Sequence, residues 1–255
     1  MRAKKSFGQH FLTNEDIARR IADSLTLGTG PTNVLEVGPG KGMLTKYLLE
    51  KDFELKTVEA DTDMVDYLNA NYPALHHKII AEDFLKLDLG SVFDGQPFYI
   101  IGNFPYNISS QIVFKMVEHR PIVPQLVGMF QKEMAERIIA SPGGKDYGII
   151  SVLTQAFYEG KYLFSVGNGN FNPPPKVQSG VIRLMRKDGE LGCDEALFRK
   201  VVKQAFSQRR KMLRNTLKPF FEHTPEVLEE SFFTQRPEVL GVRAFVDLTK
   251  RISEG

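Results

Sequence analysis

The sequence lacks several features that would take it out of the ordinary globular class. Its single cysteine, Cys193, cannot form an internal disulfide or supply a metal cluster. Its apolar runs are short, as at 126–130, whereas a membrane-spanning helix needs roughly 20 residues. The first twenty residues have no apolar core of the kind found in signal peptides. We therefore expect a cytoplasmic protein with no membrane partner.

Acidic residues are missing from one long segment, although the whole chain is nearly neutral with a net charge of +2. Residues 196–221 contain no acid and eight lysines or arginines. A charge run is usually a solvated helix face, but such faces mix both signs through i,i+4 pairs. The segment therefore also predicts binding to phosphates. The histidines show no metal-ligand spacing, and we predict no metal.

The 255 residues exceed the roughly 100–200 of a typical domain. Strand-like runs at 33–37, 54–58, 78–81, 98–102 and 125–130 alternate with helical stretches, which predicts an α/β fold with a mostly parallel sheet. Beyond about residue 188 only helical segments follow. We expect a Rossmann-like domain at 1–188 and a small all-helical domain at 189–255, with ligands at the carboxyl ends of the strands.

A glycine-rich turn follows the first of these strands and precedes a helix. Gly38 and Gly40 allow a ligand to approach the backbone, and amides at a helix start are donors. A dinucleotide fingerprint needs G-x-G-x-x-G, but Gly42 comes one residue early. Glu36 would also repel a pyrophosphate. The turn therefore argues against NAD.

Acidic residues follow the next two expected strands. Glu59 stands where a carboxylate accepts hydrogen bonds from the two hydroxyls of a ribose. Asp83 is suited to accept from the amino group of an adenine. Either residue alone is more often a loop acid or a helix cap. Together at successive strand ends they predict a nucleoside pocket without phosphate chemistry, for which S-adenosylmethionine is the common cofactor.

The fourth strand ends in Asn103-Phe104-Pro105-Tyr106. An exocyclic adenine amine is a poor nucleophile, and its two N–H groups need acceptors as the nitrogen becomes tetrahedral. The side-chain oxygen of Asn103 and the backbone carbonyl of Phe104 can supply them. Pro105 stiffens the turn, and Tyr106 offers a flat face for stacking. Because the methyl donor is a cationic sulfonium, catalysis can rest on positioning and electrostatics without a strong base.

These motifs resemble, in order and spacing, those of the ribosomal RNA adenine dimethyltransferases. The resemblance rests on residues 5–12, 36–42, 103–106, 171–179 and 206–215 and runs from about residue 4 to residue 218. It is strongest to the bacterial branch that dimethylates two adjacent adenines near the 3′ end of small-subunit rRNA. It implies a class I methyltransferase fold, S-adenosylmethionine as cofactor, and an assembling 30S particle as partner. We expect the protein to act as a monomer.

The resemblance also assigns roles to individual residues. Cofactor contacts are implied for His10, Leu12, Gly38, Glu59, Asp83 and Asn103. The target adenine is expected to lie between Tyr106 and Phe171, held out of its helical stack. RNA phosphates are expected to meet Arg209, Arg210, Lys211 and Arg214. Two residues depart from the usual family pattern: His10 stands where Asn is usual, and Phe104 stands where Leu is usual.

Three other functions remain open at this stage. A large-subunit rRNA adenine methyltransferase that confers antibiotic resistance shares the cofactor motifs, but the basic motif at 208–215 favours the small-subunit branch. A DNA adenine methyltransferase would lack the Phe171 motif. A non-catalytic RNA-binding assembly factor is disfavoured by the intact Asn103 and Tyr106.

Overall fold

The computed structural model describes residues 9–26 and 32–254. The sequence also predicts a basic N-terminal arm with Arg2, Lys4 and Lys5, but these residues lie outside this part of the chain, as does the family motif up to residue 8. Within the described ranges, no helix has both the length and the apolar character needed to cross a membrane.

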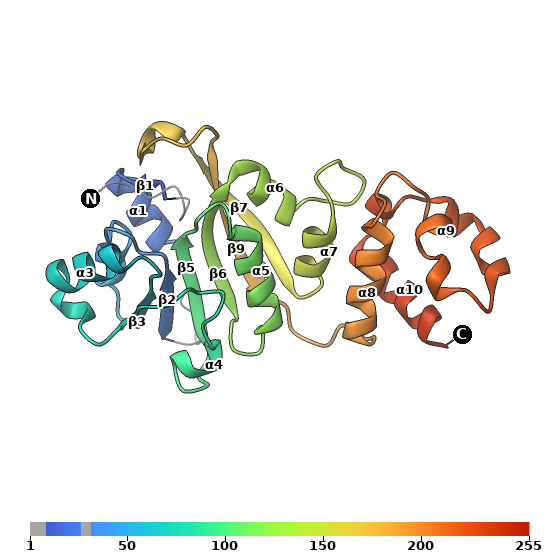
Figure 1. Ribbon diagram of the computed structural model, residues 1–255, viewed down its shortest axis with the longest axis horizontal. Coiled ribbons are helices and arrows are strands. Elements are labelled where there is room, and N and C mark those ends of the chain that lie inside the picture. The colour runs from blue at the N-terminus through green and yellow to red at the C-terminus, as the bar shows by residue number, and fades with distance from the viewer. Residues whose placement is uncertain (1–8, 27–31, 255) are drawn as a thin grey trace. The chain divides into compact units, whose positions relative to one another are not determined.

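A seven-stranded sheet has the order β4-β3-β2-β5-β6-β9-β7 (Figure 1). The strands are β2 (Asn33–Val37), β3 (Glu54–Val58), β4 (Ile79–Ile80), β5 (Phe98–Asn103), β6 (Gln125–Gln131), β7 (Tyr158–Val166) and β9 (Ser179–Arg186). The first five in the spatial order are parallel, and β9 is antiparallel to β6. The strand order reverses direction between β2 and β5, which is the place where ligands bind in open α/β sheets.

Three helices pack into one apolar core with the sheet. They are α1 (Glu15–Ala22), α2 (Thr45–Leu48) and α3 (Thr62–Asn71). Asn14 begins α1, since its side chain accepts a hydrogen bond from the amide of Ile17, as an N-cap residue does. Ile21, Leu48 and Leu68 are fully buried in this core beside strand residues. These helices hold β2 and β3, and thereby the loops that follow them.

A second, two-stranded sheet joins distant parts of the chain. β1 (Phe11–Leu12) pairs antiparallel with β8 (Phe171–Asn172), with Phe11 opposite Asn172. The side chains of Thr13 and Asn14 both bond to Asn170. The N-terminal segment is thereby attached to the segment that precedes β9. The sequence did not predict this pairing, because each strand has only two residues and no alternation can be recognised.

The described chain forms two compact units, residues 1–135 with 159–186 and residues 136–158 with 187–255. The first contains the sheet, with α4 (Leu89–Val92) and α5 (Ser109–Glu118). α6 (Lys132–Ile138) runs from the first unit into the second, which also contains α7 (Ile149–Gln155), α8 (Glu195–Phe206), α9 (Leu213–Thr216) and α10 (Val242–Glu254). The second unit thus takes in the C-terminal part of the chain from residue 187 and also residues 136–158, which the sequence analysis placed in the sheet domain.

The second unit has its own aromatic core. Phe206 packs against both Tyr147 and Phe245, with ring centroids 6.4 and 6.0 Å away. Tyr147 lies just before α7, so residues 136–158 help to bury the face of α8. This explains why the unit includes a segment that a reading along the chain assigns to the sheet domain.

Candidate active site

A cavity of about 590 Å³ opens at the carboxyl ends of the parallel strands. Its walls include at least one residue from the end of each of four neighbouring strands: Gly38 after β2, Glu59 after β3, Asp83 after β4 and Asn103 at the end of β5. The structure thus brings together the four strand-end positions that the sequence analysis singled out. The N-terminal segment 9–13 forms a further wall.

The glycine-rich turn forms the floor of the cavity beside β2. A side chain on Gly42 would come within 2.5 Å of the Tyr72 ring, and the residue has a positive φ of 79°. The Tyr72 hydroxyl donates to the backbone carbonyls of Lys41 or Gly42, at 3.2 and 3.0 Å. The early third glycine therefore leaves room for the Tyr72 ring, whose hydroxyl holds the turn and which also lines the cavity.

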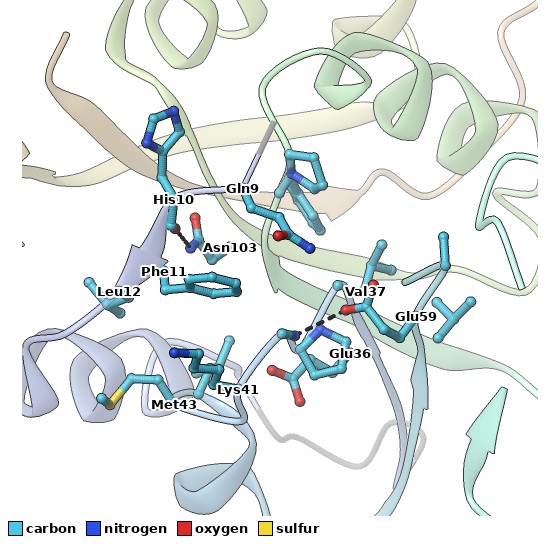
Figure 2. Close-up of a pocket in the computed structure, with 18 of the residues that line it drawn as sticks. Gln9, His10, Phe11, Leu12, Glu36, Val37, Lys41, Met43, Glu59 and Asn103 are labelled. Atoms are coloured by element: carbon cyan, nitrogen blue, oxygen red, sulfur yellow. Dashed lines mark hydrogen bonds between the residues drawn. The ribbon is translucent and has the colours of Figure 1, made fainter. Parts of the chain in front are cut away.

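Phe11 packs on the inner side of the same turn. A Cβ on Gly40 would lie 3.0 Å from the Phe11 ring, and the Lys41 ammonium lies 5.2 Å from the centre of that ring. Figure 2 shows the Phe11 ring extending into the pocket between its labelled neighbours. The sequence analysis named His10 and Leu12 as contacts and missed Phe11 between them. Strand alternation was the available signal, but the two-residue strand was not recognised.

The Glu59 carboxylate joins the end of β3 to the glycine-rich turn. One oxygen accepts from the Gly40 amide at 3.1 Å and the other from the Asp61 amide at 2.9 Å, and Figure 2 draws the first of these bonds. Burial raises the pKa of the Glu59 carboxyl above its usual range, and the two amide hydrogen bonds oppose the rise. Glu59 is only 7% exposed, so it is an acceptor with a fixed position in the cavity wall.

Glu36 is a second buried acid, located within β2. Its carboxylate accepts a hydrogen bond from the Thr45 hydroxyl at 2.7 Å. Burial raises the pKa of Glu36 to about 8, and the negative charge of Glu59 adds to the rise. A buried carboxyl without a cationic partner favours its neutral form. The residue that the sequence analysis used to argue against a pyrophosphate therefore lines the cavity mainly as a neutral carboxyl at neutral pH.

Asp83, three residues after β4, also lines the cavity wall. One of its carboxylate oxygens accepts from the Leu85 amide at 2.9 Å, which is the local turn that Asp commonly makes. This bond fixes the direction of the side chain. Phe84 is buried and also lines the cavity, so an apolar ring and an acceptor lie next to each other.

Asn103 is fixed by the N-terminal segment. Its side-chain amide nitrogen donates to the backbone carbonyl of His10 at 3.0 Å (Figure 2). A carbonyl oxygen only accepts hydrogen bonds, so the atom that faces His10 must be the amide nitrogen. The orientation of Asn103 is thereby settled, and its oxygen is the atom left for a donor in the cavity.

Phe104 is buried because two glycines make room for its ring. A Cβ on Gly128 would come within 2.2 Å of the ring and one on Gly102 within 2.8 Å, and the ring meets Phe130 edge-on at 5.1 Å. Only the backbone of Phe104 is placed for a polar role. The departure from Leu is therefore accommodated by Gly128 in the neighbouring strand.

Tyr106 is half-buried, and both its ring and its hydroxyl have partners. The hydroxyl shares a 2.6 Å hydrogen bond with the Ser179 hydroxyl. The His10 ring is stacked on the Tyr106 ring, with centroids 5.3 Å apart and 29° between the planes.

Gly38 and Pro105 also approach each other, since a Cβ on Gly38 would be 3.7 Å from the proline ring. The β2 and β5 ends thus form one wall.

The expectation that Phe171 stacks on a target base is wrong for this structure. The ring is only 4% exposed and belongs to the apolar core with Leu12 and Val166. It does not line the cavity, whereas its neighbour Asn172 does. The reason is the pairing of β1 with β8, which turns Phe171 inward opposite Leu12. Leu12 is likewise mainly a core residue, at 5% exposed.

The predicted phosphate contacts in the second unit differ in exposure. Arg210 and Lys211 are exposed, whereas Arg209 and Arg214 are half-buried. The Arg209 guanidinium donates to the carbonyl of Gly144 at 3.1 Å. The sequence predicts a helix over residues 209–217, but residues 209–212 are not helical: Met212 has extended backbone angles and α9 begins only at Leu213.

The fold and cavity define a Rossmann-like methyltransferase. The family model for "Ribosomal RNA adenine dimethylase" matches residues 1–239, and the chain belongs to this family. The enzyme class is therefore an adenine methyltransferase, and its cofactor is S-adenosylmethionine.

Two relatives and two solved structures show how far the similarity extends. "Ribosomal RNA small subunit methyltransferase A" of Bacteroides thetaiotaomicron is 53% identical over 100% of this chain and 95% of the relative. The protein of the same name from Flavobacterium johnsoniae is 54% identical over 99% and 96%. A dimethyladenosine transferase from Plasmodium falciparum is 25% identical with a TM-score of 0.80, over 96% of this chain and 98% of the other. The 23S rRNA methyltransferase ErmE is 24% identical with a TM-score of 0.66, over 95% and 99%, and shows the shared fold.

Proposed function

We propose that the protein transfers methyl groups to the N6 amines of two adjacent adenines near the 3′ end of small-subunit rRNA. The observation that carries this proposal is the convergence of four strand ends on one cavity, with the Asn103 oxygen fixed toward it. The small-subunit relatives at 53% and 54% identity support this substrate over large-subunit rRNA.

The residues present fit S-adenosylmethionine. Glu59 offers a buried carboxylate for the ribose hydroxyls, Asp83 an acceptor for the adenine amine, and the turn at Gly38 and Gly40 an approach for the methionine part. When bound, the cofactor supplies a methyl group on a positively charged sulfur. The Glu59 carboxylate places negative potential in the cavity wall, which favours a cationic ligand.

Asn103, Phe104 and Tyr106 act on the target amine. The Asn103 side-chain oxygen and the Phe104 carbonyl accept hydrogen bonds from the two amine N–H groups, so the nitrogen lone pair is directed out of the ring plane toward the methyl group, and one amine proton leaves to solvent after the transfer. Tyr106 stacks on the base, which compensates for part of the cost of taking it out of its stack. Base stacking on aromatic side chains contributes about 1–3 kcal/mol per base.

RNA phosphates are bound by the basic residues of the second unit. Arg210 and Lys211 are exposed and we propose them as direct contacts, with Arg214 beside them. We further propose that residues 189–255, together with 136–158, form the RNA-binding domain. The partner is then an assembling 30S particle. The protein works in the cytoplasm, where bacterial ribosomes assemble. That it acts as a monomer stays a prediction, which light scattering in solution checks.

The test is the incubation of labelled cofactor with small subunits that lack the modification, followed by nucleoside analysis. The proposal predicts N6,N6-dimethyladenosine at two adjacent positions in the small-subunit rRNA. Label in large-subunit rRNA, or binding to the particle without any methylated adenine, would overturn it.

Glu59→Ala should weaken cofactor binding about 10-fold or more, as expected for losing a charged acceptor. Glu54→Ala, at the start of the same strand, is the matched control.

A further inference from the structure

The ring of His10 is turned away from the cofactor part of the cavity. It lies on the Tyr106 ring, with centroids 5.3 Å apart, and its Nδ1 is 2.8 Å from the carbonyl of Pro173. Because that carbonyl only accepts, Nδ1 carries the proton. Figure 2 shows the imidazole extending from the backbone on the side away from Glu36 and Glu59.

His10 contacts both residues that the proposed function places at the target amine. Its backbone carbonyl accepts from the Asn103 side chain at 3.0 Å, and its imidazole covers one face of Tyr106. The next residue, Phe11, pairs with Asn172, so the backbone on either side of this contact is held by the short β1–β8 sheet. His10 is thus fixed through its ring, through its carbonyl and through its neighbour.

We propose that the His10 ring is a positioning residue for the target adenine rather than a cofactor contact, an inference that rests on the proposed function. With the Phe171 ring buried, His10 is the side chain that fixes the plane of Tyr106 from one face, while the Ser179 hydroxyl fixes its outer end at 2.6 Å. Rings 5.3 Å apart leave no space for a base between them. The adenine therefore stacks on the other face of Tyr106.

The opposite arrangement would make His10 an obstacle. If the adenine took the face that His10 covers, base binding would have to break the Pro173 hydrogen bond and the ring stack. Removal of the ring would then make RNA bind more tightly. The two arrangements predict changes of opposite sign, which makes them separable by a single substitution.

The substitutions are His10→Ala, which removes the ring, and His10→Phe, which keeps a flat ring and loses the bond to Pro173. Asn14→Ala is the control, because it removes a 2.9 Å bond from the same segment to Asn170 and the N-cap bond of α1 without touching Tyr106. Three quantities are measured on the full-length protein. They are the dissociation constant of S-adenosylhomocysteine, kcat and KM with unmodified small subunits, and the fluorescence of a small-subunit 3′ stem-loop that carries 2-aminopurine at a target position.

We expect His10→Ala to lower kcat on the order of 10-fold, as a loosened near-attack geometry does, and to reduce the quenching of 2-aminopurine. The cofactor dissociation constant should change less than about twofold, because no cofactor contact is lost. His10→Phe should recover most of kcat and of the quenching. Asn14→Ala should leave the quenching unchanged.

Each of three results would overturn the inference. Cofactor affinity that falls together with kcat would make His10 a cofactor residue. A lower KM or stronger quenching in His10→Ala would make it an obstacle. Equal behaviour of His10→Ala, His10→Phe and Asn14→Ala would make its role merely structural. If the wild-type protein forms no dimethyladenosine, the proposed function fails instead, and that result is read in the same assay.

Discussion

The side-chain amide of Asn103 and the backbone carbonyl of His10 are joined by a 3.0 Å hydrogen bond that links β5 to the N-terminal segment. The bond connects two residues 93 positions apart in the sequence and determines which atom of Asn103 faces the cavity. The orientation of the main candidate for amine recognition therefore depends on a segment that pairs with β8.

Asn103→Ala and Asn103→Asp should both abolish methyl transfer, for different reasons. Alanine removes the acceptor for the target amine. Aspartate retains an acceptor but cannot donate to the His10 carbonyl, so the two oxygens repel each other. Loss of a preorganised polar partner in an active site typically costs on the order of 10²–10³ in kcat, and we expect at least that loss in single-turnover assays. Binding to small subunits should persist, and full activity of either variant would contradict the role.

Phe171→Ala should act on stability. The ring is 4% exposed within the apolar core, and truncation of a buried phenylalanine costs about 3–5 kcal/mol of unfolding free energy. Denaturant titration measures this loss, and Phe171→Leu should restore most of it. A stable Phe171→Ala protein with reduced turnover would instead reinstate the stacking role expected from the sequence.

Glu36 should make stability fall as the pH rises. Because the folded-state pKa is raised from 4.5 to about 8, the native protein binds more protons than the unfolded chain between these values. The free energy of unfolding contributed by this group therefore decreases across that window, by at most about 1.4 kcal/mol per pH unit.

The comparison with Glu36→Gln isolates this contribution. Glutamine keeps an acceptor for the Thr45 hydroxyl and has no titrating proton. The difference in unfolding free energy between the two proteins should grow in favour of the variant from pH 5 to pH 8. Parallel pH profiles would show that the Glu36 carboxyl titrates as it does in the unfolded chain.

The basic residues of the second unit should separate into two kinds. Arg210 and Lys211 are exposed, and each alanine substitution should reduce the slope of log affinity against log salt by about 0.7–0.9. Arg209 is bonded to Gly144, so its substitution should change the salt slope less. Filter binding of the rRNA at several salt concentrations measures the slopes, with Lys51→Ala in the first unit as control. Equal slopes for all variants would exclude direct phosphate contacts.

The sequence predicted the central sheet well because most of its strands are largely buried apolar runs that alternate with helices. The strands at 33–37 and 54–58 are confirmed residue for residue as β2 and β3, and the positions after them meet as parallel topology requires. Glu59 and Asn103 were accessible to this reasoning because they stand directly at strand ends.

Features made by non-local pairing were not accessible. The two-residue strands β1 and β8 have no periodicity, so neither the inward turn of Phe171 nor the position of Phe11 could be predicted. The assignment of residues 136–158 to the second unit depends on Tyr147 packing against Phe206, a contact between residues 59 positions apart. Such contacts depend on packing in three dimensions, which a local pattern does not encode.

The most direct test of the account is a crystal structure of the protein with S-adenosylhomocysteine. The account predicts the ribose hydroxyls within hydrogen-bond distance of Glu59, the adenine amine beside Asp83, and the sulfur directed toward Asn103. A ligand bound outside the cavity at the four strand ends, or bound within it with its adenine beside Asn103, would contradict the account.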